Sequence, residues 1–172
     1  AHIGHYSGLI FFGREVMGSK RIPLYLMPEM ENFIRSNGPW SQLVKLRNVE
    51  IKQLKVNKPI ELSNVAITPF LVPHRDEFSE TVGFSISGPN RKAIFIPDIN
   101  KWSEWDRSLI EVVKDSNYVL IDATFYKDGE LPGRDMSKIP HPFVTESMSL
   151  LLKLPYLERG KVWFIHMNHT NP

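Results

Sequence analysis

Residues 92–98 read Lys-Ala-Ile-Phe-Ile-Pro-Asp, a short apolar run that ends at a proline and an aspartate. An apolar run of this length, bounded by turn residues, is typical of a buried β-strand. After it the chain alternates, with a helix predicted over 104–114, a strand over 118–121, a helix around 146–153 and a strand over 161–165. Ser103 and Asp106 match a capping box for the first of those helices. Alternating strands and helices predict an α/β fold in which helices cover a mixed sheet.

The chain before this stretch is predicted to be richer in strands. Runs with a period of two and many β-branched residues cover 49–56, 65–72 and 81–87. Further upstream we expect a helix over 8–17 with Ser7 as its N-cap, a strand over 22–26 and a helix over 28–36. Residues 40–46 fit a helix or a loop. No internal repeat is present, so residues 1–172 are predicted to form a single domain.

Composition excludes several classes of protein. The 172 residues are 42% hydrophobic and 23% charged, which is too apolar for a disordered chain. No apolar run approaches the ~18 to 20 residues that cross a bilayer, so neither a membrane partner nor a membrane location is expected. The chain has no cysteine, so a metal would have to be held by histidine and carboxylate. We expect a cytoplasmic protein.

The charge balance gives no sign of a nucleic-acid partner. The net charge is only +2, from 21 basic and 19 acidic residues. The most basic stretch, Lys45–Lys58, also contains Glu50 and has no interleaved aromatic residue. It therefore fits a solvated strand and turn better than a nucleic-acid surface.

Both ends of the chain are dense in polar motifs. It opens on Ala-His-Ile-Gly-His and stops at Asn-His-Thr-Asn-Pro, without an initiator methionine. Natural termini usually fray and carry little chemistry. We therefore expect this chain to be a slice of a longer protein, cut at both ends.

The histidines lie at informative places along the chain. His74 follows the strand predicted over 65–72, Asp98 follows the strand over 92–96, and His166 follows the strand over 161–165, while His2 and His5 lie just before a predicted helix. In open α/β sheets, ligands bind where the carboxyl ends of the strands meet. Imidazole and carboxylate are good ligands for Zn²⁺, Fe and Mn. Any one of these histidines alone is as well explained as a hydrogen-bonded loop residue, but together they predict a metal site.

These motifs resemble those of the metallo-β-lactamase superfamily. His-Ile-Gly-His-Tyr-Ser-Gly-Leu at 2–9 is similar to the latter part of its signature, His-x-His-x-Asp-His followed by a Gly-Leu helix start. Val-Pro-His at His74, Ile-Pro-Asp at Asp98 and Phe-Ile-His at His166 follow in the order of its later metal motifs. Residues 71–84 and 134–143 are similar to the branch labelled coenzyme PQQ synthesis protein B, the PqqB-like branch. The resemblance covers the whole chain and implies an αββα four-layer sandwich whose N-terminal part is missing.

The resemblance also implies a set of metal ligands, which would hold one or two Zn²⁺ ions, with Fe or Mn as alternatives: His2, His5, His74, Asp98, His166 and His169. The first histidine of the signature would lie immediately before Ala1. Gly4 stands where the family usually has an aspartate that helps to hold a second metal. One ion held by His2, His74 and the missing histidine, beside Asp98, is therefore the safer expectation. His5 and His166 would hold a weaker second ion, and His169 either replaces a lost ligand or is an exposed loop residue.

A second constellation resembles the tRNA-processing branch of the superfamily. Asp122-Ala-Thr-Phe follows the strand over 118–121, and His141 lies before the last predicted helix. The resemblance implies that Asp122 and His141 assist protonation of the leaving group, and a carboxylate that holds a histidine in one tautomer is a sound general acid. The rigid turn Pro140-His-Pro142 explains His141 equally well.

Several charged residues near these motifs can be interpreted in two ways. The acidic residues Asp76, Glu77 and Glu80 either support the site or form a solvated loop, and Arg75 and Arg134 would suit an anionic substrate. The resemblance implies a metal-dependent hydrolase that acts on an ester, phosphoester, thioester or lactone of a small molecule, with Asp98, Asp122 and His141 as catalytic residues. The alternatives are a PqqB-like iron-dependent oxygenase or accessory protein in PQQ synthesis, and a degenerate metal-binding or scaffold protein that lost turnover with the change at Gly4.

Overall fold

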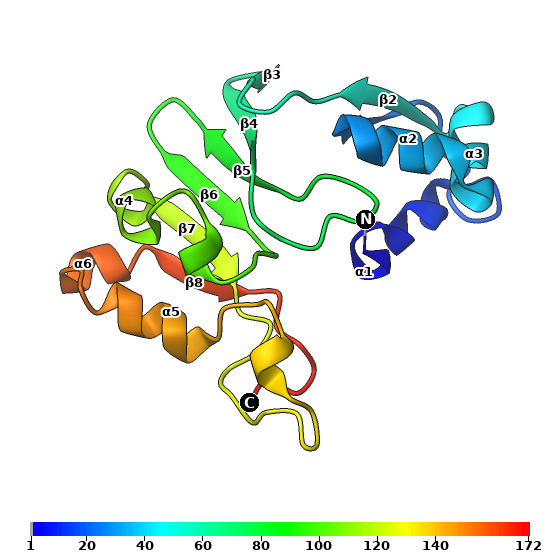
Figure 1. Cartoon of the computed structure of the whole chain (residues 1–172). Coiled ribbons are helices and arrows are strands. Elements are labelled where there is room, and N and C mark those ends of the chain that lie inside the picture. The colour runs from blue at the N-terminus through cyan, green and yellow to red at the C-terminus, as the bar shows by residue number, and fades with distance from the viewer. Residues whose placement is uncertain (1) are drawn as a thin grey trace. The chain divides into compact units, whose positions relative to one another are not determined.

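A computed structural model describes residues 2–172 of the chain, which fall into two compact units (Figure 1). The first unit comprises the chain up to residue 58 together with residues 75–80, and the second comprises 59–74 and 81–172. The prediction of a single domain over 1–172 stays a prediction. Within residues 2–172, no helix is both long and apolar enough to span a membrane.

The first unit holds a two-stranded parallel sheet and three short helices. The strands are β1 (Ile22–Leu26) and β2 (Val49–Gln53), and the helices are α1 (Ile3–Tyr6), α2 (Pro28–Ser36) and α3 (Gly38–Lys45). The predicted bounds of β1 and α2 are confirmed, and residues 40–46 are helical. Proline lies in the first turn of both α2 and α3, where a missing N–H costs no hydrogen bond.

The helix predicted over 8–17 is wrong. The α-helix ends at Tyr6 and continues as a 3₁₀ helix over Ser7–Phe12, so Ser7 is not an N-cap. Tyr6 packs edge-on against the rings of Phe33 and Trp40, each with 5.2 Å between centroids. The chain then folds back at Gly13, where a Cβ atom would lie only 3.0 Å from the Ile10 carbonyl oxygen. The 3₁₀ helix ends at Phe12, well before Met17.

The second unit is built on a six-stranded mixed sheet in the order β3-β4-β5-β6-β7-β8. Its strands are β3 (Ile60–Leu62), β4 (Val65–Leu71), β5 (Val82–Ser87), β6 (Lys92–Ile96), β7 (Tyr118–Asp122) and β8 (Val162–Ile165). Neighbours from β3 to β6 are antiparallel, whereas β6, β7 and β8 are parallel. The predicted strands are confirmed to within three residues at their ends, and β3 is an addition.

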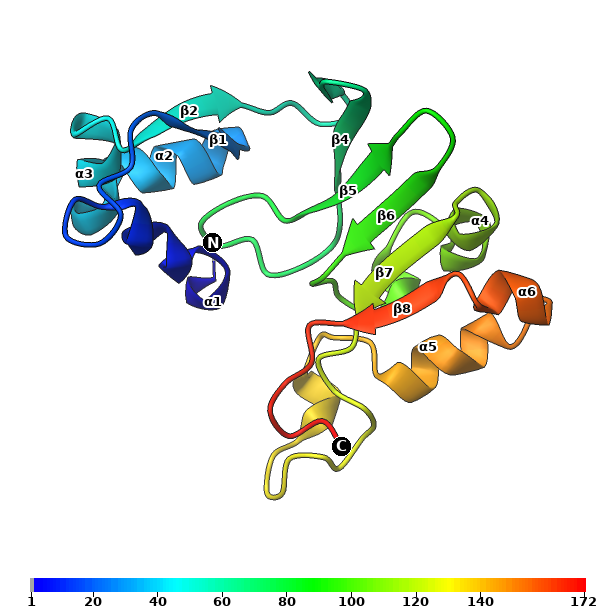
Figure 2. The same ribbon diagram turned by 180° about the vertical axis from the view of Figure 1, so that it is seen from behind.

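This topology brings four strand ends to one edge of the sheet. Because β5 is antiparallel to both β4 and β6, those two strands run in the same direction, which β7 and β8 share. The arrowheads of β6, β7 and β8 point to the same end of the sheet in Figure 2. The carboxyl ends of β4, β6, β7 and β8 therefore meet at one edge.

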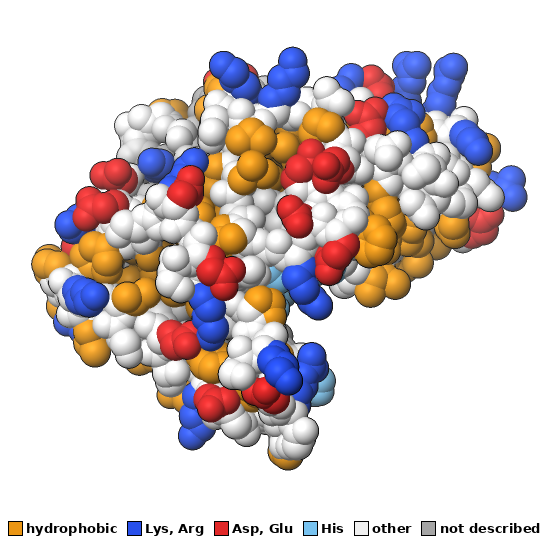
Figure 3. All heavy atoms as spheres, in the orientation of Figure 1, with side chains coloured by type: hydrophobic (Ala, Val, Ile, Leu, Met, Phe, Trp, Pro, Cys, Tyr) orange, Lys and Arg blue, Asp and Glu red, His pale blue; other side chains and the backbone are white. Residues whose placement is uncertain are grey.

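Three helices lie on one side of this sheet: α4 (Leu109–Lys114), α5 (Val144–Leu151) and α6 (Tyr156–Arg159) (Figures 1 and 2). Apolar residues of α4 and α5 pack on β6 and β7 to form the main core, which includes Ile96, Leu109, Val113, Ile121 and Leu151. On the face shown in Figure 3, acidic and basic side chains of this unit are interspersed with apolar ones, and neither sign forms a continuous patch.

The helix predicted over 104–114 begins later than expected. Its N-cap is Ser108, whose hydroxyl accepts from the Glu111 N–H at 3.5 Å, so the capping box at Ser103 and Asp106 is wrong. The segment before it, with a 3₁₀ turn over Trp102–Glu104, buries two indole rings instead. The Trp102 Nε1–H donates to the Ser147 hydroxyl at 2.8 Å, which ties this segment to α5.

A second small core supports the long connection between β7 and α5. Its buried members are Phe125, Met136, Ile139 and Phe143, with Leu131 packed against them. A 3₁₀ turn over Met136–Lys138 lies in this connection. Hydrogen bonds from Ser137 and Lys138 hold the pKa of the Asp135 carboxyl below its ordinary value, which favours the charged form at the start of that turn.

Candidate metal centre

The edge where four strands end carries the polar residues of the second unit. His74 lies three residues beyond β4, Asp98 two residues beyond β6, Asp122 at the last position of β7, and His166 directly after β8. The predicted placement of His74, Asp98 and His166 at one edge of a sheet is confirmed, whereas that of His2 and His5 stays a prediction. His141 reaches the same region from the connection before α5, where its ring contacts Phe125 of the small core at 6.0 Å between centroids.

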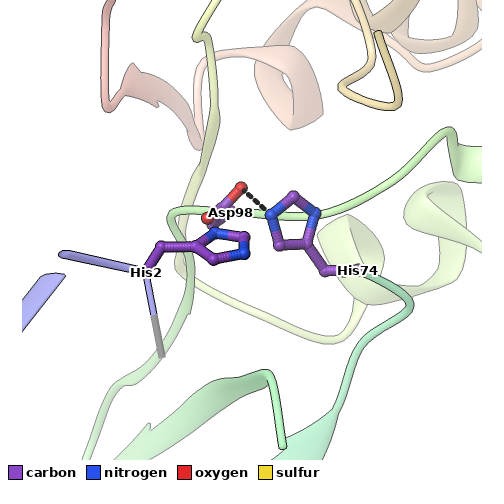
Figure 4. Close-up of side chains that lie close together, drawn as sticks. All are labelled: His2, His74 and Asp98. Carbon is purple, nitrogen blue, oxygen red and sulfur yellow. Dashed lines mark ion pairs between the residues drawn. The ribbon is translucent and has the colours of Figure 1, made fainter. Parts of the chain in front are cut away.

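The ring of His74 is held by a chain of hydrogen bonds. Its Nδ1 lies 3.0 Å from the Asn100 Oδ1, and the Asn100 Nδ2 donates to Glu104 at 2.8 Å. Because the amide oxygen can only accept, Nδ1 carries a proton. The Nε2 of the same ring lies 3.0 Å from the Asp98 Oδ1, as the dashed line in Figure 4 marks. Both side chains are almost fully buried.

Asp122 is fully buried, and both of its carboxylate oxygens accept hydrogen bonds. Oδ2 accepts from the Ile99 N–H at 3.1 Å and from the His141 Nδ1 at 2.7 Å. Oδ1 accepts from the N–H and the hydroxyl of Thr124, at 2.8 and 2.7 Å. A carboxylate that accepts from this many donors fixes the orientation of the groups around it. Asp122 therefore sets the tautomer of His141, with the proton on Nδ1.

His166 has an unusual backbone conformation, with φ of 63°. Non-glycine residues seldom adopt this left-handed region, and those that do are common at functional sites. Its Nδ1 lies 3.0 Å from the Thr124 hydroxyl. The backbone around it is tied down by the Ala123 N–H, which donates to Ile165, and by the Asn168 N–H, which donates to Thr124.

The three histidines of this edge therefore share one pattern. In each of His74, His141 and His166, a neighbouring side chain engages the Nδ1 atom. Metal-binding histidines almost always have their second nitrogen held in this way. Asp98 lies among them: its Oδ1 is 3.4 Å from the His141 Nδ1, and a ligand atom of its carboxylate lies within 4.8 Å of one on His166.

Asp98, Asp122 and His141 also offer ligand atoms within 4.8 Å of one another. Asp122 is nevertheless a poor ligand, because each of its oxygens already accepts two hydrogen bonds. We interpret Asp122 as the support of the site and Asp98 as its carboxylate ligand. Imidazole nitrogen and carboxylate oxygen, without thiolate, form a donor set that fits Zn²⁺, Fe or Mn.

His2 and His5 belong to the first unit, so their part in a metal site stays a prediction. His2 is the N-cap of α1, and His5 is exposed on that helix. The Nε2 of His2 lies 3.6 Å from Glu77, whose pKa is lowered by a backbone hydrogen bond and further by His2. Gly4 has open space where a Cβ would be, so packing does not demand a glycine at the position of the family's aspartate.

The remaining predicted residues lie on exposed loops. His169 is exposed, with its Nδ1 3.1 Å from the Asn168 Oδ1, and it is outside the clusters of ligand atoms formed by residues 2–172. Its role as a ligand stays a prediction. Arg75 and Arg134 are exposed as well. Glu80 has a structural role, because its carboxylate accepts from the Glu29 N–H of α2 at 3.1 Å.

Sequence reasoning missed the residues that hold the histidines in place. Asn100, Glu104 and Thr124 each lie a few residues after a strand end, within the segments that carry Asp98 and Asp122. Their proximity to those motifs was the only available signal, because nothing in their spacing shows that they reach histidines 26 and 42 positions away.

Comparisons with known proteins agree with this architecture. The family model of the beta-lactamase superfamily domain matches residues 1–167. Zn²⁺-bound PqqB from Methylobacterium extorquens has a TM-score of 0.75 at 19% identity, over 99% of this chain and 58% of that one. YhfI from Bacillus subtilis, a metallo-β-lactamase fold protein, has a TM-score of 0.62 at 16% identity, over 98% of this chain and 61% of that one. Unliganded yeast PDE1 has a TM-score of 0.64 at 15% identity, over 97% of this chain and 55% of that one. The comparison with curated proteins finds no match.

The chain spans about three fifths of the length of these solved structures, between 55% and 61%. The resemblance to the PqqB-like branch is confirmed at the level of the fold, and the metallo-β-lactamase fold class is confirmed with it. The sheet with helices on one side and the polar residues at its strand ends agree with the same assignment. The chain belongs to the beta-lactamase superfamily domain family.

Proposed function

We propose that this chain carries the larger part of the metal centre of a hydrolase, which directs water at an ester, phosphoester, thioester or lactone of a small molecule. The observation that supports the proposal is the common orientation of His74, His141 and His166, each held through Nδ1 beside the carboxylate of Asp98. Such preorganisation is what a metal centre needs, and a merely structural histidine does not.

His74, His166 and Asp98 would hold the metal, and His2, His5 and His169 are proposed to complete its ligands. Bound there, a divalent cation would supply Lewis acidity and lower the pKa of a bound water to about 7. The chain's own acid–base pair is Asp122 and His141, whose Nδ1–H donates to the buried carboxylate at 2.7 Å. Nε2, on the far side of the ring from Asp122, can take a proton from the attacking water and then give it to a departing oxygen or sulfur.

The proposal is tested by metal content and turnover measured on the same samples. The chain is purified without added metal, analysed for zinc, iron and manganese, and assayed with a chromogenic phosphodiester, a thioester and a lactone. Phosphoesters come first because a diphosphatase of the PhnP family has a similar fold, with a TM-score of 0.53 at 21% identity over 99% of this chain and 56% of that one.

Two aspartate variants separate the site from general effects on the protein. Asp98→Asn removes the buried carboxylate, whereas Asp106→Asn makes the same change on an exposed loop. Loss of a residue that supports a metal ligand costs about 10- to 100-fold in metal affinity or activity. We expect Asp98→Asn, which removes a ligand itself, to lose more than that in both. Asp106→Asn should match the wild type. Equal metal content and turnover in wild type and Asp98→Asn would contradict the proposal.

The two rival functions give different results in this experiment. Bound iron with consumption of dioxygen and no hydrolysis would support the PqqB-like oxygenase or accessory role in PQQ synthesis. A wild-type chain that binds none of the three metals would support a degenerate protein in which the change at Gly4 ended turnover. Either result overturns the hydrolase proposal.

A further inference from the structure

The hydroxyl of Thr124 lies between two functional side chains of the second unit. Thr124 is two residues beyond the end of β7, and its Oγ1 is 2.7 Å from the Asp122 Oδ1 and 3.0 Å from the His166 Nδ1. A hydroxyl offers one hydrogen to donate and two lone pairs to accept. The direction of these two hydrogen bonds therefore determines which nitrogen of His166 carries the proton.

The direction follows from the surroundings of Asp122. Two backbone N–H groups, from Ile99 and Thr124, donate to its carboxylate, one to each oxygen, and backbone N–H groups can only donate. The Thr124 hydroxyl lies 2.7 Å from the same oxygen, Oδ1, that accepts from the Thr124 N–H, and it donates there as a second donor. The single hydrogen of the Thr124 hydroxyl is thus given to Asp122. Its oxygen then accepts from His166, whose proton lies on Nδ1 and whose lone pair lies on Nε2.

We propose that Thr124 is a positioning residue. Its hydroxyl is held by Asp122 and in turn fixes the tautomer and the ring orientation of His166. One buried carboxylate then fixes two histidines, His141 directly and His166 through the threonine hydroxyl. His166 is exposed and has a left-handed backbone conformation, so it has less surrounding packing to hold its ring than a buried residue has. The hydrogen bond to the Thr124 hydroxyl is correspondingly more important for its orientation. The inference rests on the proposed function only in taking His166 as a residue of the metal centre.

The structure allows the hydroxyl to be removed while the backbone contacts are kept. The Thr124 carbonyl accepts from the Asn168 N–H at 3.0 Å, and the Thr124 N–H donates to Asp122 at 2.8 Å. Neither bond involves the side chain of Thr124. Thr124→Val keeps the branched shape and both of these bonds, whereas Thr124→Ser keeps the hydroxyl and loses only a methyl group.

The test reads the tautomer of each histidine ring in the metal-free chain. In ¹⁵N-labelled protein at a pH above the ordinary histidine pKa of about 6.5, long-range ¹H–¹⁵N spectra distinguish Nδ1–H from Nε2–H rings. We expect His166 to be an Nδ1–H ring in the wild type and in Thr124→Ser, and mainly an Nε2–H ring in Thr124→Val. His141 should keep its Nδ1–H pattern in all three, because its bond to Asp122 is direct.

Zinc affinity gives a second readout that does not depend on turnover. Competition with a chromogenic chelator should show affinity about 10- to 100-fold weaker for Thr124→Val, and close to wild type for Thr124→Ser. Thr68→Val, in the middle of β4, is the matched control and should change neither the spectra nor the affinity. The pair Thr124→Ala and Thr124→Ser repeats the comparison without depending on how valine packs.

The outcomes separate this inference from the proposed function. An unchanged Nδ1–H ring of His166 in both Thr124→Val and Thr124→Ala overturns the positioning role, whatever the activity. Weaker zinc binding without a change of tautomer also overturns it, since the effect would then come from packing. If the tautomer changes as expected but the wild type neither binds metal nor hydrolyses any substrate, Thr124 still positions His166 and the hydrolase proposal fails.

Discussion

At the scale of single residues, the support of His74 is as important as His74 itself. The Asn100 amide accepts from the His74 Nδ1 at 3.0 Å and donates to Glu104 at 2.8 Å, which prevents the amide from turning over. The Asn100 N–H also donates to the Pro73 carbonyl at 2.7 Å, so the backbone before His74 is held as well. The ring is therefore fixed before any ligand arrives.

Asn100→Ala tests this support. It removes the acceptor of the His74 Nδ1–H, so the ring can change tautomer, and the affinity for zinc should fall about 10- to 100-fold. The measurement is chelator competition with the metal-free chain. Asn90→Ala, on the exposed turn between β5 and β6, should leave affinity unchanged. Equal affinities for the two variants would show that Asn100 has no part in holding the ring.

The sequence predicted the candidate site residues at strand ends but not their supports. His74, Asp98 and His166 were found because their places follow from strands that can be recognised by pattern. Asn100 and Thr124 were missed because asparagine and threonine after a strand are ordinary turn residues. Only the register of the sheet brings Thr124 to within 3.0 Å of the His166 ring, 42 positions along the chain.

At the scale of elements, the start of β5 depends on Gly83, a residue without a side chain. A Cβ at Gly83 would lie 2.7 Å from two ring carbons of Phe70 and 3.1 Å from the Phe95 carbonyl oxygen. The Phe70 ring is buried, stacked on Trp105 at 6.0 Å and covered by the Arg107 guanidinium at 4.8 Å. A Cβ at Gly83 would therefore overlap a ring that already has neighbours on its faces.

Gly83→Ala should therefore lower the free energy of unfolding of the second unit by about 1–3 kcal/mol, the usual cost of overpacking. Gly88→Ala is the matched control, because a Cβ there would meet nothing closer than the Arg91 carbonyl oxygen at 3.7 Å. Urea unfolding followed by tryptophan fluorescence measures both, since Trp102 and Trp105 are buried in this unit. A loss of similar size in Gly88→Ala would show that general strand propensity, rather than the contact with Phe70, is responsible.

Elements were predictable where local pattern and tertiary packing agree. The predicted bounds of β1, α2 and β6 are those of the structure, because proline, glycine or turn residues mark their ends. The three-residue strand β3 is too short to carry a period. The first helix and the start of α4 were wrong because tertiary contacts of aromatic rings, those of Tyr6 with Phe33 and those of the buried Trp102 and Trp105, are not reported by local propensity.

At the scale of the whole molecule, the two units have cores of different extent. The second contains the large core around Ile96, Val113 and Ile121, all with zero exposure, whereas the first rests on a two-stranded sheet with mostly half-exposed strands. Two-stranded sheets are marginally stable on their own. The α/β class followed from the alternation of elements, but the division into two units did not, because it depends on contacts that no local pattern records.

Amide hydrogen exchange should resolve this difference. We expect the protected amides of β6 and β7 to exchange at least about tenfold more slowly than those of β1 and β2, since local opening is easier where little apolar surface is buried. Mass spectrometry of peptic fragments under native conditions measures both sets in one sample. Equal protection of the two sheets would mean that the chain opens only as a single cooperative body.

The first unit is made of two separate segments of the chain, which limits how it can be expressed on its own. Residues 75–80 belong to that unit although they follow β4 in the chain, and the Glu80 carboxylate among them accepts from the Glu29 N–H at the start of α2. A fragment that stops at Lys58 would lack this helix cap, so excision by a single cut gives an incomplete module. A fusion protein that is to keep α2 intact therefore has to include residues 75–80, the connection between β4 and β5.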